Sequence, residues 1–249
     1  MPSHRNLGRP LIRLGTVTST MDIARRLESH GAAEGTSVIA AAQTHGRGRS
    51  DRIWQSPVRT GLYCSILLRP QIPSDRFRPF SVAAGLALCE ALDPTHWLGL
   101  QLKWPNDILF KEKKLAGILI TTSLTGHIVD SAILGIGLNL LPDPTRPETA
   151  ISLAELDGAF PPFVRTPLTP IFDALSKRYS AIVDSDISAI ADWPNRLAYH
   201  RQPVTLQDAQ TTRTGSLEGL DLAGALILTT TNGPRVITSG DLTRGPSLA

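Results

Sequence analysis

Apolar and polar residues along the first 140 positions repeat with the spacings of both helices and strands. Ile23, Ala24 and Leu27 fall on one face of a helix that begins at the capping residue Ser19 and ends at Gly31. Short apolar runs bounded by glycine, proline or polar residues are typical of buried strands. Such runs predict strands over 36–42, 61–68, 100–104, 108–110, 115–122 and 127–140, and a longer apolar run predicts a helix over 79–92.

The pattern changes twice in the second half of the chain. Residues 142–170 contain seven prolines and predict a connecting excursion, which is followed by helices over 170–183 and 186–199. After residue 200, short alternating segments at 204–206, 212–220, 225–230 and 235–239 are separated by glycines and predict a small β-barrel. We therefore expect an α+β fold: a mixed β-sheet with packed helices in residues 1–200, and the small barrel in residues 201–249.

Composition narrows the class of protein. Of 249 residues, 41% are hydrophobic, which supports a folded core, and the net charge of +3 is too small to indicate a nucleic-acid or membrane partner. The two cysteines, Cys64 and Cys89, lie in apolar runs and are expected to be buried thiols. The absence of a disulfide framework, a signal peptide and a long apolar run predicts a cytoplasmic protein.

The sequence Lys-Trp-Pro-Asn-Asp at 103–107 places a lysine, an amide and a carboxylate around one short turn. Lys114 opens a second motif, Lys-Leu-Ala-Gly-Ile-Leu at 114–119, seven residues later. Lysine ammonium groups can neutralise phosphate oxygens, and a single aspartate can share a Mg²⁺ ion with them. Taken alone, the same residues also fit an ordinary β-turn.

A glycine–arginine loop follows the second predicted strand. Residues 43–59 carry four arginines against one aspartate, and Gly46 and Gly48 permit close approach of the backbone to a ligand. Arginine forks suit phosphate and carboxylate oxygens. We expect the loop to be mobile without an anion and ordered by one; a solvated basic loop or an RNA contact is the alternative. It is not a P-loop, because Gly-x-x-x-x-Gly-Lys-Ser/Thr is absent.

These motifs and Gly-Ile-Gly-Leu-Asn at 135–139 occur in an order that closely resembles biotin protein ligase, also called biotin–[acetyl-CoA-carboxylase] ligase, over roughly residues 12–245. The resemblance implies a catalytic domain of the class II aminoacyl-tRNA synthetase-like, biotin–lipoate ligase type and a C-terminal SH3-like barrel. It implies biotin, ATP and Mg²⁺ as ligands. It also implies a biotin carboxyl carrier protein domain of acetyl-CoA carboxylase or a related carboxylase as partner, with homodimerisation through strands 100–140 as an expectation.

The resemblance also assigns residues to the site. Lys103, Asp107 and Arg49 are candidate catalytic residues, and Asp107 is the candidate metal ligand. The candidate substrate-binding residues are Ser19, Thr20 and Gln43 for biotin; Gly46, Arg47, Gly48, Arg49, Arg52 and Trp54 in the loop that closes over both substrates; Lys114 and Gly117 at the biotin end; Asn106, Asp107 and Asn139 on the nucleotide side; and Arg244, reaching in from the small domain.

Two positions depart from the family pattern. Met21 stands where asparagine is usual, so any amide contact made there is lost. Asp51 replaces a loop glycine; aspartate tolerates a left-handed backbone, but its charge lies beside phosphate-seeking arginines and is expected to loosen retention of an anionic intermediate. Because the catalytic pattern already begins at Ser19, we expect no N-terminal helix-turn-helix domain and no repressor function.

Biotinyl-5′-AMP formation followed by transfer to a carrier lysine is the expected reaction. Three alternatives stay open at this point. The chain could be a lipoate or octanoyl ligase, although both lysine motifs favour biotin. It could be an RNA-binding protein, although only 5% of its residues are aromatic. Met21 and Asp51 also leave open a biotin-binding regulator that has lost catalysis.

Overall fold

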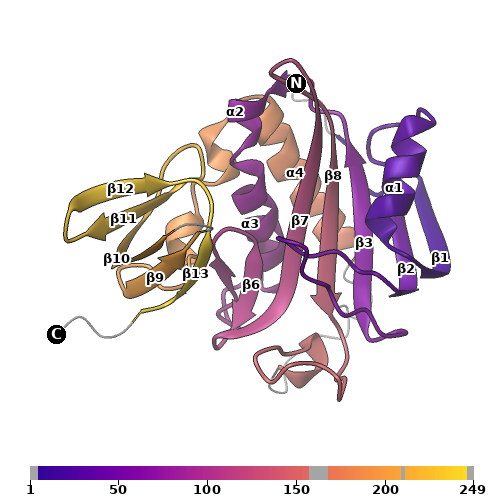
Figure 1. Cartoon of the computed structure of the whole chain (residues 1–249). Helices are drawn as coiled ribbons and strands as arrows, with labels where there is room; N and C mark the ends of the chain where they lie inside the picture. Colours follow the sequence, from indigo (N-terminus) through magenta and orange to yellow (C-terminus); the bar gives the residue numbers. More distant parts are fainter. Residues whose placement is uncertain (1–4, 157–167, 209–210, 246–249) are drawn as a thin grey trace.

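The computed structural model describes residues 5–156, 168–208 and 211–245. One large sheet lies beside a smaller one, and helices pack against the large sheet (Figure 1). The α+β class is therefore confirmed. Among the described residues, every helix is too short or too polar to span a lipid bilayer.

The large sheet has eight strands and mixed pairing. Its strands are β1 (Leu11–Val17), β2 (Ser37–Gln43), β3 (Gly61–Leu68), β4 (Ile72–Pro73), β5 (Gln101–Lys103), β6 (Asp107–Phe110), β7 (Lys113–Thr125) and β8 (Ile128–Asn139). They are arranged in the order β1-β2-β3-β8-β7-β6-β5, and β4 pairs with β8. Strands β1 and β2 are parallel, whereas the other neighbours are antiparallel. The expected β-hairpin between β7 and β8 is present, with Gly126 in its turn at φ 60°.

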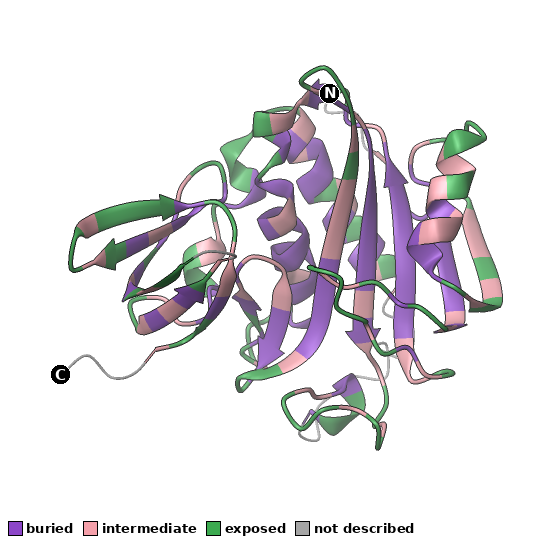
Figure 2. Ribbon diagram, viewed as in Figure 1, coloured by how far each residue is buried: buried purple, intermediate pink, exposed green. Residues whose placement is uncertain are grey.

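Opposite faces of this sheet carry different helices. Helices α3 (Phe80–Leu92) and α4 (Leu168–Val183) share the main hydrophobic core with Ile66 and Leu134, whereas α1 (Thr20–Ser29) packs in a separate cluster with Leu67 and Ile133. Successive side chains of a strand point to opposite faces, which explains this division. Helix α3 is almost wholly buried between the sheet and α4 (Figure 2).

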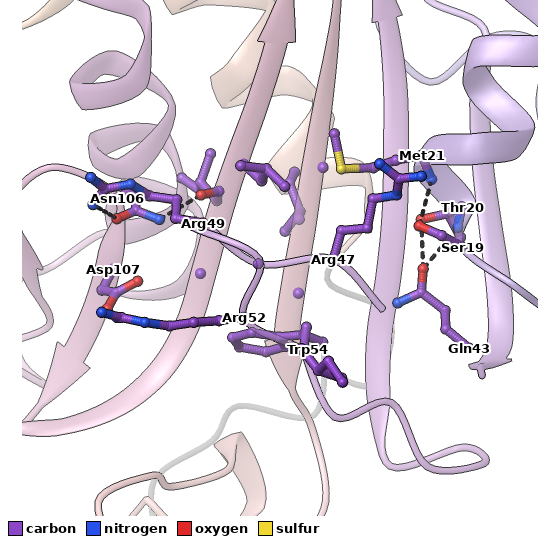
Figure 3. Close-up of a pocket in the computed structure, with 18 of the residues that line it drawn as sticks. Ser19, Thr20, Met21, Gln43, Arg47, Arg49, Arg52, Trp54, Asn106 and Asp107 are labelled. Carbon is purple, nitrogen blue, oxygen red and sulfur yellow. Dashed lines mark hydrogen bonds between the residues drawn. The ribbon is translucent and has the colours of Figure 1, made fainter. Parts of the chain in front are cut away.

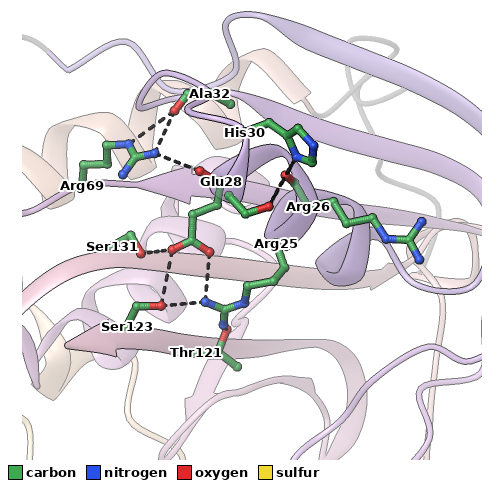
Figure 4. A network of polar contacts seen from close by, with 10 residues as sticks. Arg25, Arg26, Glu28, His30, Ala32, Arg69, Thr121, Ser123 and Ser131 are labelled. Atoms are coloured by element: carbon green, nitrogen blue, oxygen red, sulfur yellow. Dashed lines mark hydrogen bonds and ion pairs between the residues drawn. The ribbon is translucent and has the colours of Figure 1, made fainter. Parts of the chain in front are cut away.

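A partly buried carboxylate fixes α1 to its face of the sheet (Figure 4). Glu28 accepts hydrogen bonds from Ser131 on β8 and from Ser123 on β7, the latter at 3.3 Å. Arg25 pairs with Glu28 at 3.0 Å and donates to Ser123 at 2.8 Å. The helix is therefore attached at its C-terminal end, and its N-terminal end lies over the middle of the sheet.

The second sheet is antiparallel and has five strands. They are β9 (Pro203–Gln207), β10 (Thr212–Leu220), β11 (Leu226–Thr230), β12 (Gly233–Ile237) and β13 (Asp241–Arg244), in the order β12-β11-β10-β9-β13. Trp104 donates its indole N–H to Gly224 O at 3.0 Å, and Leu102 and Leu217 belong to one hydrophobic cluster. The two sheets therefore share a hydrophobic core. The division into two domains at residue 200 and the SH3-like type of the second domain stay predictions.

The helix predicted over 186–199 is wrong. The segment instead contains two 3₁₀ turns, Ile187–Ala189 and Trp193–Asn195. Pro194 has no amide hydrogen and cannot continue a helix, and Ala198 leaves the second turn to hydrogen-bond Leu102 of β5 at 2.9 Å. Tertiary pairing with the edge of the large sheet therefore determines this backbone.

Several short elements were not predicted from the sequence. Strand β1 lies at the sheet edge and has no fully buried residue among its seven, so its apolar signal is weak. Strand β4, the single-turn helix α2 (Ser74–Phe77) and β13 are each four residues or fewer. Of the excursion predicted over 142–170, residues 157–167 lie outside the described residues, and α4 begins at Leu168.

Candidate functional site

A cavity of about 160 Å³ opens on the sheet face that carries α1 (Figure 3). Three glycines of the sheet line it: Gly117 on β7 pairs with Gly137 on β8, and Gly135 lies two residues before Gly137. The start of α1, the glycine–arginine loop and the turn before β6 surround it. The structure gathers here twelve of the residues predicted from the sequence: Ser19, Thr20, Gln43, Arg47, Gly48, Arg49, Arg52, Trp54, Asn106, Asp107, Lys114 and Gly117.

The end of the cavity beneath α1 is polar and buried. Ser19 caps α1, since its hydroxyl accepts from the amide of Met21 at 3.3 Å, as predicted. Gln43 accepts hydrogen bonds from the amide of Thr20 at 2.8 Å and from its hydroxyl at 3.1 Å. The Gln43 amide nitrogen donates to Ser56 at 2.8 Å, which fixes the orientation of the side chain. Prearranged donors and acceptors of this kind can recognise a neutral polar group.

Trp54 lies directly over the glycines of the sheet. A Cβ atom on Gly137 would come within 2.3 Å of the Trp54 ring, and one on Gly117 within 3.0 Å. These glycines are therefore needed for the indole to approach the backbone. The indole Nε1 is buried and has no hydrogen-bond partner, although buried polar atoms are normally satisfied. The ammonium nitrogen of Lys114 lies 5.2 Å from the ring centroid.

Carboxylates from two directions hold the loop arginines. Arg47 pairs with Asp22 of α1 at 2.6 Å. Arg49 and Arg52 both pair with Asp241 of β13, Arg49 at 3.4 Å. The positive charges that were expected to repel one another are thus compensated by acids outside the loop. Mobility of the loop without an anion stays a prediction.

The turn before β6 connects the loop to the lysine motif. Asn106 accepts from Arg49 at 3.2 Å and donates to Ile118 O at 2.7 Å. Asp107 pairs with Lys114 at 2.8 Å, and its side chain is 18% exposed. An ammonium group, an amide and an arginine fork therefore converge where an anionic ligand would meet the cavity.

The donor set for a metal ion is small. Within the described ranges, no three histidine, cysteine, aspartate or glutamate side chains form a cluster that could hold a metal. Asp107 is the carboxylate at the centre of the site, and it is already paired with Lys114. This set fits Mg²⁺ that keeps most of its water and phosphate ligands and takes one protein carboxylate, rather than a metal enclosed by the protein.

A second cavity, of about 230 Å³, lies on the other side of Trp54 and Lys114. The predicted residue Asn139 lines this cavity, and its amide donates to the backbone oxygens of Lys114 and Ile151 at 3.3 and 3.1 Å. Tyr63 also lines it, and burial raises the pKa of its phenol. The sequence did not indicate Tyr63, Asp143 and Arg146 as site residues, because they belong to no motif with a recognisable spacing.

Three predicted residues lie elsewhere in the structure. Lys103 of β5 and Arg244 of β13 do not line either cavity; Arg244 instead pairs with Glu112 at 2.6 Å on the surface. Gly46 lies beside the site and packs against Trp54 O, where a Cβ would come within 2.3 Å. The catalytic role of Lys103 and the nucleotide contact of Arg244 stay predictions.

Asp241 is the residue by which the small sheet reaches the first cavity, and sequence reasoning missed it. It lies in the sequence Gly-Asp-Leu-Thr-Arg, of which only the last residue, Arg244, was predicted as a site residue.

The structure also shows where the two departures from the family pattern lie. Met21 lines the cavity and packs over Gly135, and Asp51 adopts φ 59°, so the left-handed backbone expected of it is confirmed.

The chain is similar to known proteins over most of its length. Residues 14–139 match the Biotin/lipoate A/B protein ligase family, and residues 202–242 match the Biotin protein ligase C terminal domain. The bifunctional ligase/repressor BirA of Bacillus subtilis is 30% identical over 251 residues, covering 96% of this chain and 75% of that protein. The biotin–[acetyl-CoA-carboxylase] ligase of Paracoccus denitrificans is 31% identical over 218 residues, covering 82% and 88% respectively.

A solved structure extends the similarity to three dimensions. The biotin protein ligase of Aquifex aeolicus in complex with biotin and ATP superposes with a TM-score of 0.74 and 30% sequence identity. The match covers 94% of this chain and 98% of that one, so it includes both sheets.

Proposed function

This chain belongs to the biotin/lipoate A/B protein ligase family, and from that premise we propose that it joins biotin to AMP and then to a carrier lysine. The carrier is a biotin carboxyl carrier domain of acetyl-CoA carboxylase or a related carboxylase. One observation carries the proposal: a single cavity has a neutral polar end at Gln43 and a cationic end at Arg49 and Lys114. Biotin has the matching polarity, with a neutral ureido ring at one end and a carboxylate at the other.

Biotin lies with its ureido ring toward α1 in this proposal. Ser19, Thr20 and Gln43 supply hydroxyl and amide groups there. The tail runs past Met21 and Trp54, between the polar end of the cavity and its cationic end. The carboxylate then reaches Lys114, whose ammonium group can pair with it in place of Asp107.

ATP occupies the other side of Trp54 and Lys114. Its base enters the second cavity beside Asn139 and Tyr63, and its phosphates extend toward Arg47, Arg49 and Arg52. Each guanidinium has five N–H donors, so the arginine forks can meet phosphate oxygens while they keep their carboxylate partners. The unpaired Nε1 of Trp54 is a donor available to a ligand at the junction of the two cavities.

The first chemical step forms a mixed anhydride. A biotin carboxylate oxygen attacks the α-phosphorus, the bond from that phosphorus to the bridging oxygen breaks, and pyrophosphate leaves. Arg49 and Lys114 stabilise the negative charge that builds up on the phosphate oxygens. The ordered loop keeps water away from the reactive biotinyl-5′-AMP.

The second step transfers the acyl group. The neutral amine of the carrier lysine attacks the biotinyl carbonyl carbon, and AMP leaves with the electron pair of the acyl–phosphate bond. Asp107 lies near this carbon in the proposed arrangement and can accept a hydrogen bond from the amine. The amine loses its proton to solvent or AMP.

Mg²⁺ would enter with the triphosphate rather than reside in the protein. Bound there, it neutralises phosphate charge. Asp107 is the side chain that would hold it, and Asn106 can hydrogen-bond to its water ligands.

Mass spectrometry tests the proposed function directly. Purified protein is mixed with biotin, ATP, Mg²⁺ and a recombinant carrier domain, and the carrier is expected to gain the mass of one biotinyl group. A carrier with arginine in place of the acceptor lysine is the control and gains nothing. Failure to modify the first carrier, together with no biotin-dependent exchange of pyrophosphate into ATP, would remove the proposal.

The family description names lipoate as well as biotin, so lipoate stays an alternative substrate. Calorimetric titration with biotin and with lipoate separates them, and tight binding of biotin alone is expected. Tight biotin binding without carrier modification would instead support a regulator that has lost catalysis.

A further inference from the structure

Asp241 connects the small sheet to the glycine–arginine loop. Its two carboxylate oxygens face different loop residues: Oδ1 lies 3.4 Å from Arg49, and Oδ2 pairs with Arg52. The neighbouring carbonyl of Gly240 accepts a further hydrogen bond from Arg49 at 3.2 Å. Two adjacent residues, Gly240 and Asp241, therefore hydrogen-bond these arginines at the start of β13.

The small sheet is a rigid anchor for these contacts. Strand β13 pairs with β9 along its whole length, with Asp241 opposite Gln207. The sheet itself is joined to the turn between β5 and β6 by the Trp104–Gly224 hydrogen bond, and Trp193 of the preceding 3₁₀ turn packs against Gly219, where a Cβ would come within 2.1 Å. Asp241 thus cannot follow the loop without disturbing a shared hydrophobic core.

Arg49 also contacts the turn that precedes β6. The same guanidinium that meets Asp241 also donates to Asn106 at 3.2 Å, one residue before Asp107. The loop is consequently tied at both ends of the cavity: by Asp22 to α1 and by Asp241 to the small sheet.

We propose that Asp241 is a positioning residue that latches the loop closed from the small sheet and so sets how long the acyl adenylate is retained. The retention role rests on the proposed function above. The latch itself depends only on contacts present without any ligand. Asp241 is not proposed to touch the reacting atoms.

Limited proteolysis of the ligand-free protein measures the latch, because trypsin cleaves after Arg49 and Arg52. Asp241→Asn keeps the shape of the side chain and removes its charge. It is expected to speed cleavage within residues 46–54 about three- to tenfold, the range for losing two partly exposed charge-assisted contacts. Asp241→Glu keeps a carboxylate and is expected to restore most of the protection.

Glu218→Gln is the matched control. Glu218 is an exposed acid of β10 in the same small sheet, and the same unit of negative charge is removed there. Cleavage at the wild-type rate is expected. Equal cleavage rates in wild type and Asp241→Asn, with unchanged circular dichroism and melting temperature, would overturn the latch.

Release of the intermediate measures the retention role. After incubation with biotin and ATP but no carrier, rapid gel filtration separates free from bound biotinyl-5′-AMP. Asp241→Asn is expected to raise the dissociation rate about three- to tenfold, and Glu218→Gln is expected to leave it unchanged. Faster loop cleavage with an unchanged dissociation rate would show that the latch does not control how long biotinyl-5′-AMP is retained. If wild type forms no adenylate, the proposed function and the retention role fail together, and the cleavage ratio still decides the latch.

Discussion

The ammonium nitrogen of Lys114 lies 2.8 Å from a carboxylate oxygen of Asp107, on the neighbouring strand of the same hairpin. This pair joins the two lysine motifs that were recognised separately in the sequence. It places Lys114 on the boundary between the two cavities. Lys103, the other candidate lysine, lines neither of them.

Substitution of the two lysines decides which one serves the chemistry. Lys114→Ala is expected to reduce adenylate formation on the order of 10²–10³-fold, as for loss of one well-aimed charge-stabilising group. The sequence motif alone predicts the same loss for Lys103→Ala. Biotin-dependent pyrophosphate exchange measures both variants. Near-normal exchange in Lys114→Ala would contradict the geometry, and near-normal exchange in Lys103→Ala would remove Lys103 from the chemistry.

Gly137→Ala is expected to displace Trp54. The new Cβ would lie 2.3 Å from the indole, which must then move away from the sheet. Overpacking of this kind costs about 1–3 kcal/mol, so ATP is expected to bind roughly ten- to a hundredfold more weakly. Calorimetric titration measures the affinity.

Gly15→Ala is the control for this substitution, because a Cβ on Gly15 of β1 meets nothing within 4 Å. It is expected to bind ATP as wild type does. Unchanged affinity in Gly137→Ala would show that the position of the indole does not matter for the nucleotide.

Glu28→Ala is expected to loosen α1. The substitution removes the acceptor of Ser131 and Ser123 and the partner of Arg25. Loss of these partly buried hydrogen bonds to a charged group lowers the free energy of unfolding by about 2–4 kcal/mol. Urea denaturation measures the loss, and biotin affinity should fall with it because α1 carries Ser19 and Thr20 to the cavity.

Arg26→Ala serves as the comparison in the same helix. The Arg26 side chain is exposed and points away from the network of Figure 4. Its substitution is expected to change stability by less than about 0.5 kcal/mol. A loss equal to that of Glu28→Ala would show that the effect comes from the helix and not from the Glu28 carboxylate.

Alkaline pH is expected to destabilise the protein through its thiols. Burial raises the pKa of both Cys64 and Cys89 from 9.0 to about 12. Between these values the unfolded thiols lose their protons while the folded ones keep them. Stability is therefore complete below pH 9 and decreases as pH rises toward 12.

Urea denaturation at two pH values measures this effect. The free energy of unfolding is expected to be lower at about pH 10.5 than at about pH 8, by roughly 2 kcal/mol for each thiol. Burial also raises the pKa of Tyr63, Tyr179 and Tyr199, so these phenols add to the decrease. Cys89→Ala should make the decrease smaller by roughly 2 kcal/mol, whatever its effect on stability at neutral pH. Rapid reaction of both native thiols with a disulfide reagent at neutral pH would contradict their burial.

The sequence predicted the strands and helices that have a strong periodic pattern and a large apolar face. It also predicted most of the residues that line the first cavity, because the lysine motifs and the glycine–arginine loop are contiguous. It missed β1, whose residues are only partly buried, and it predicted a helix over 186–199 where pairing of Ala198 with Leu102 determines the backbone. Local patterns do not record pairing between residues almost a hundred positions apart.

The sequence by itself thus determined the family, the α+β class and most of the residues that line the first cavity, since each depends on short contiguous motifs. Tertiary structure alone decided the partners of those residues. Asp241 meets Arg49 and Arg52 across almost two hundred residues, and Trp54 rests on Gly137 because a sheet brings them together. Such contacts arise when distant segments are packed around one core, and their distances are not encoded in any local stretch of the chain.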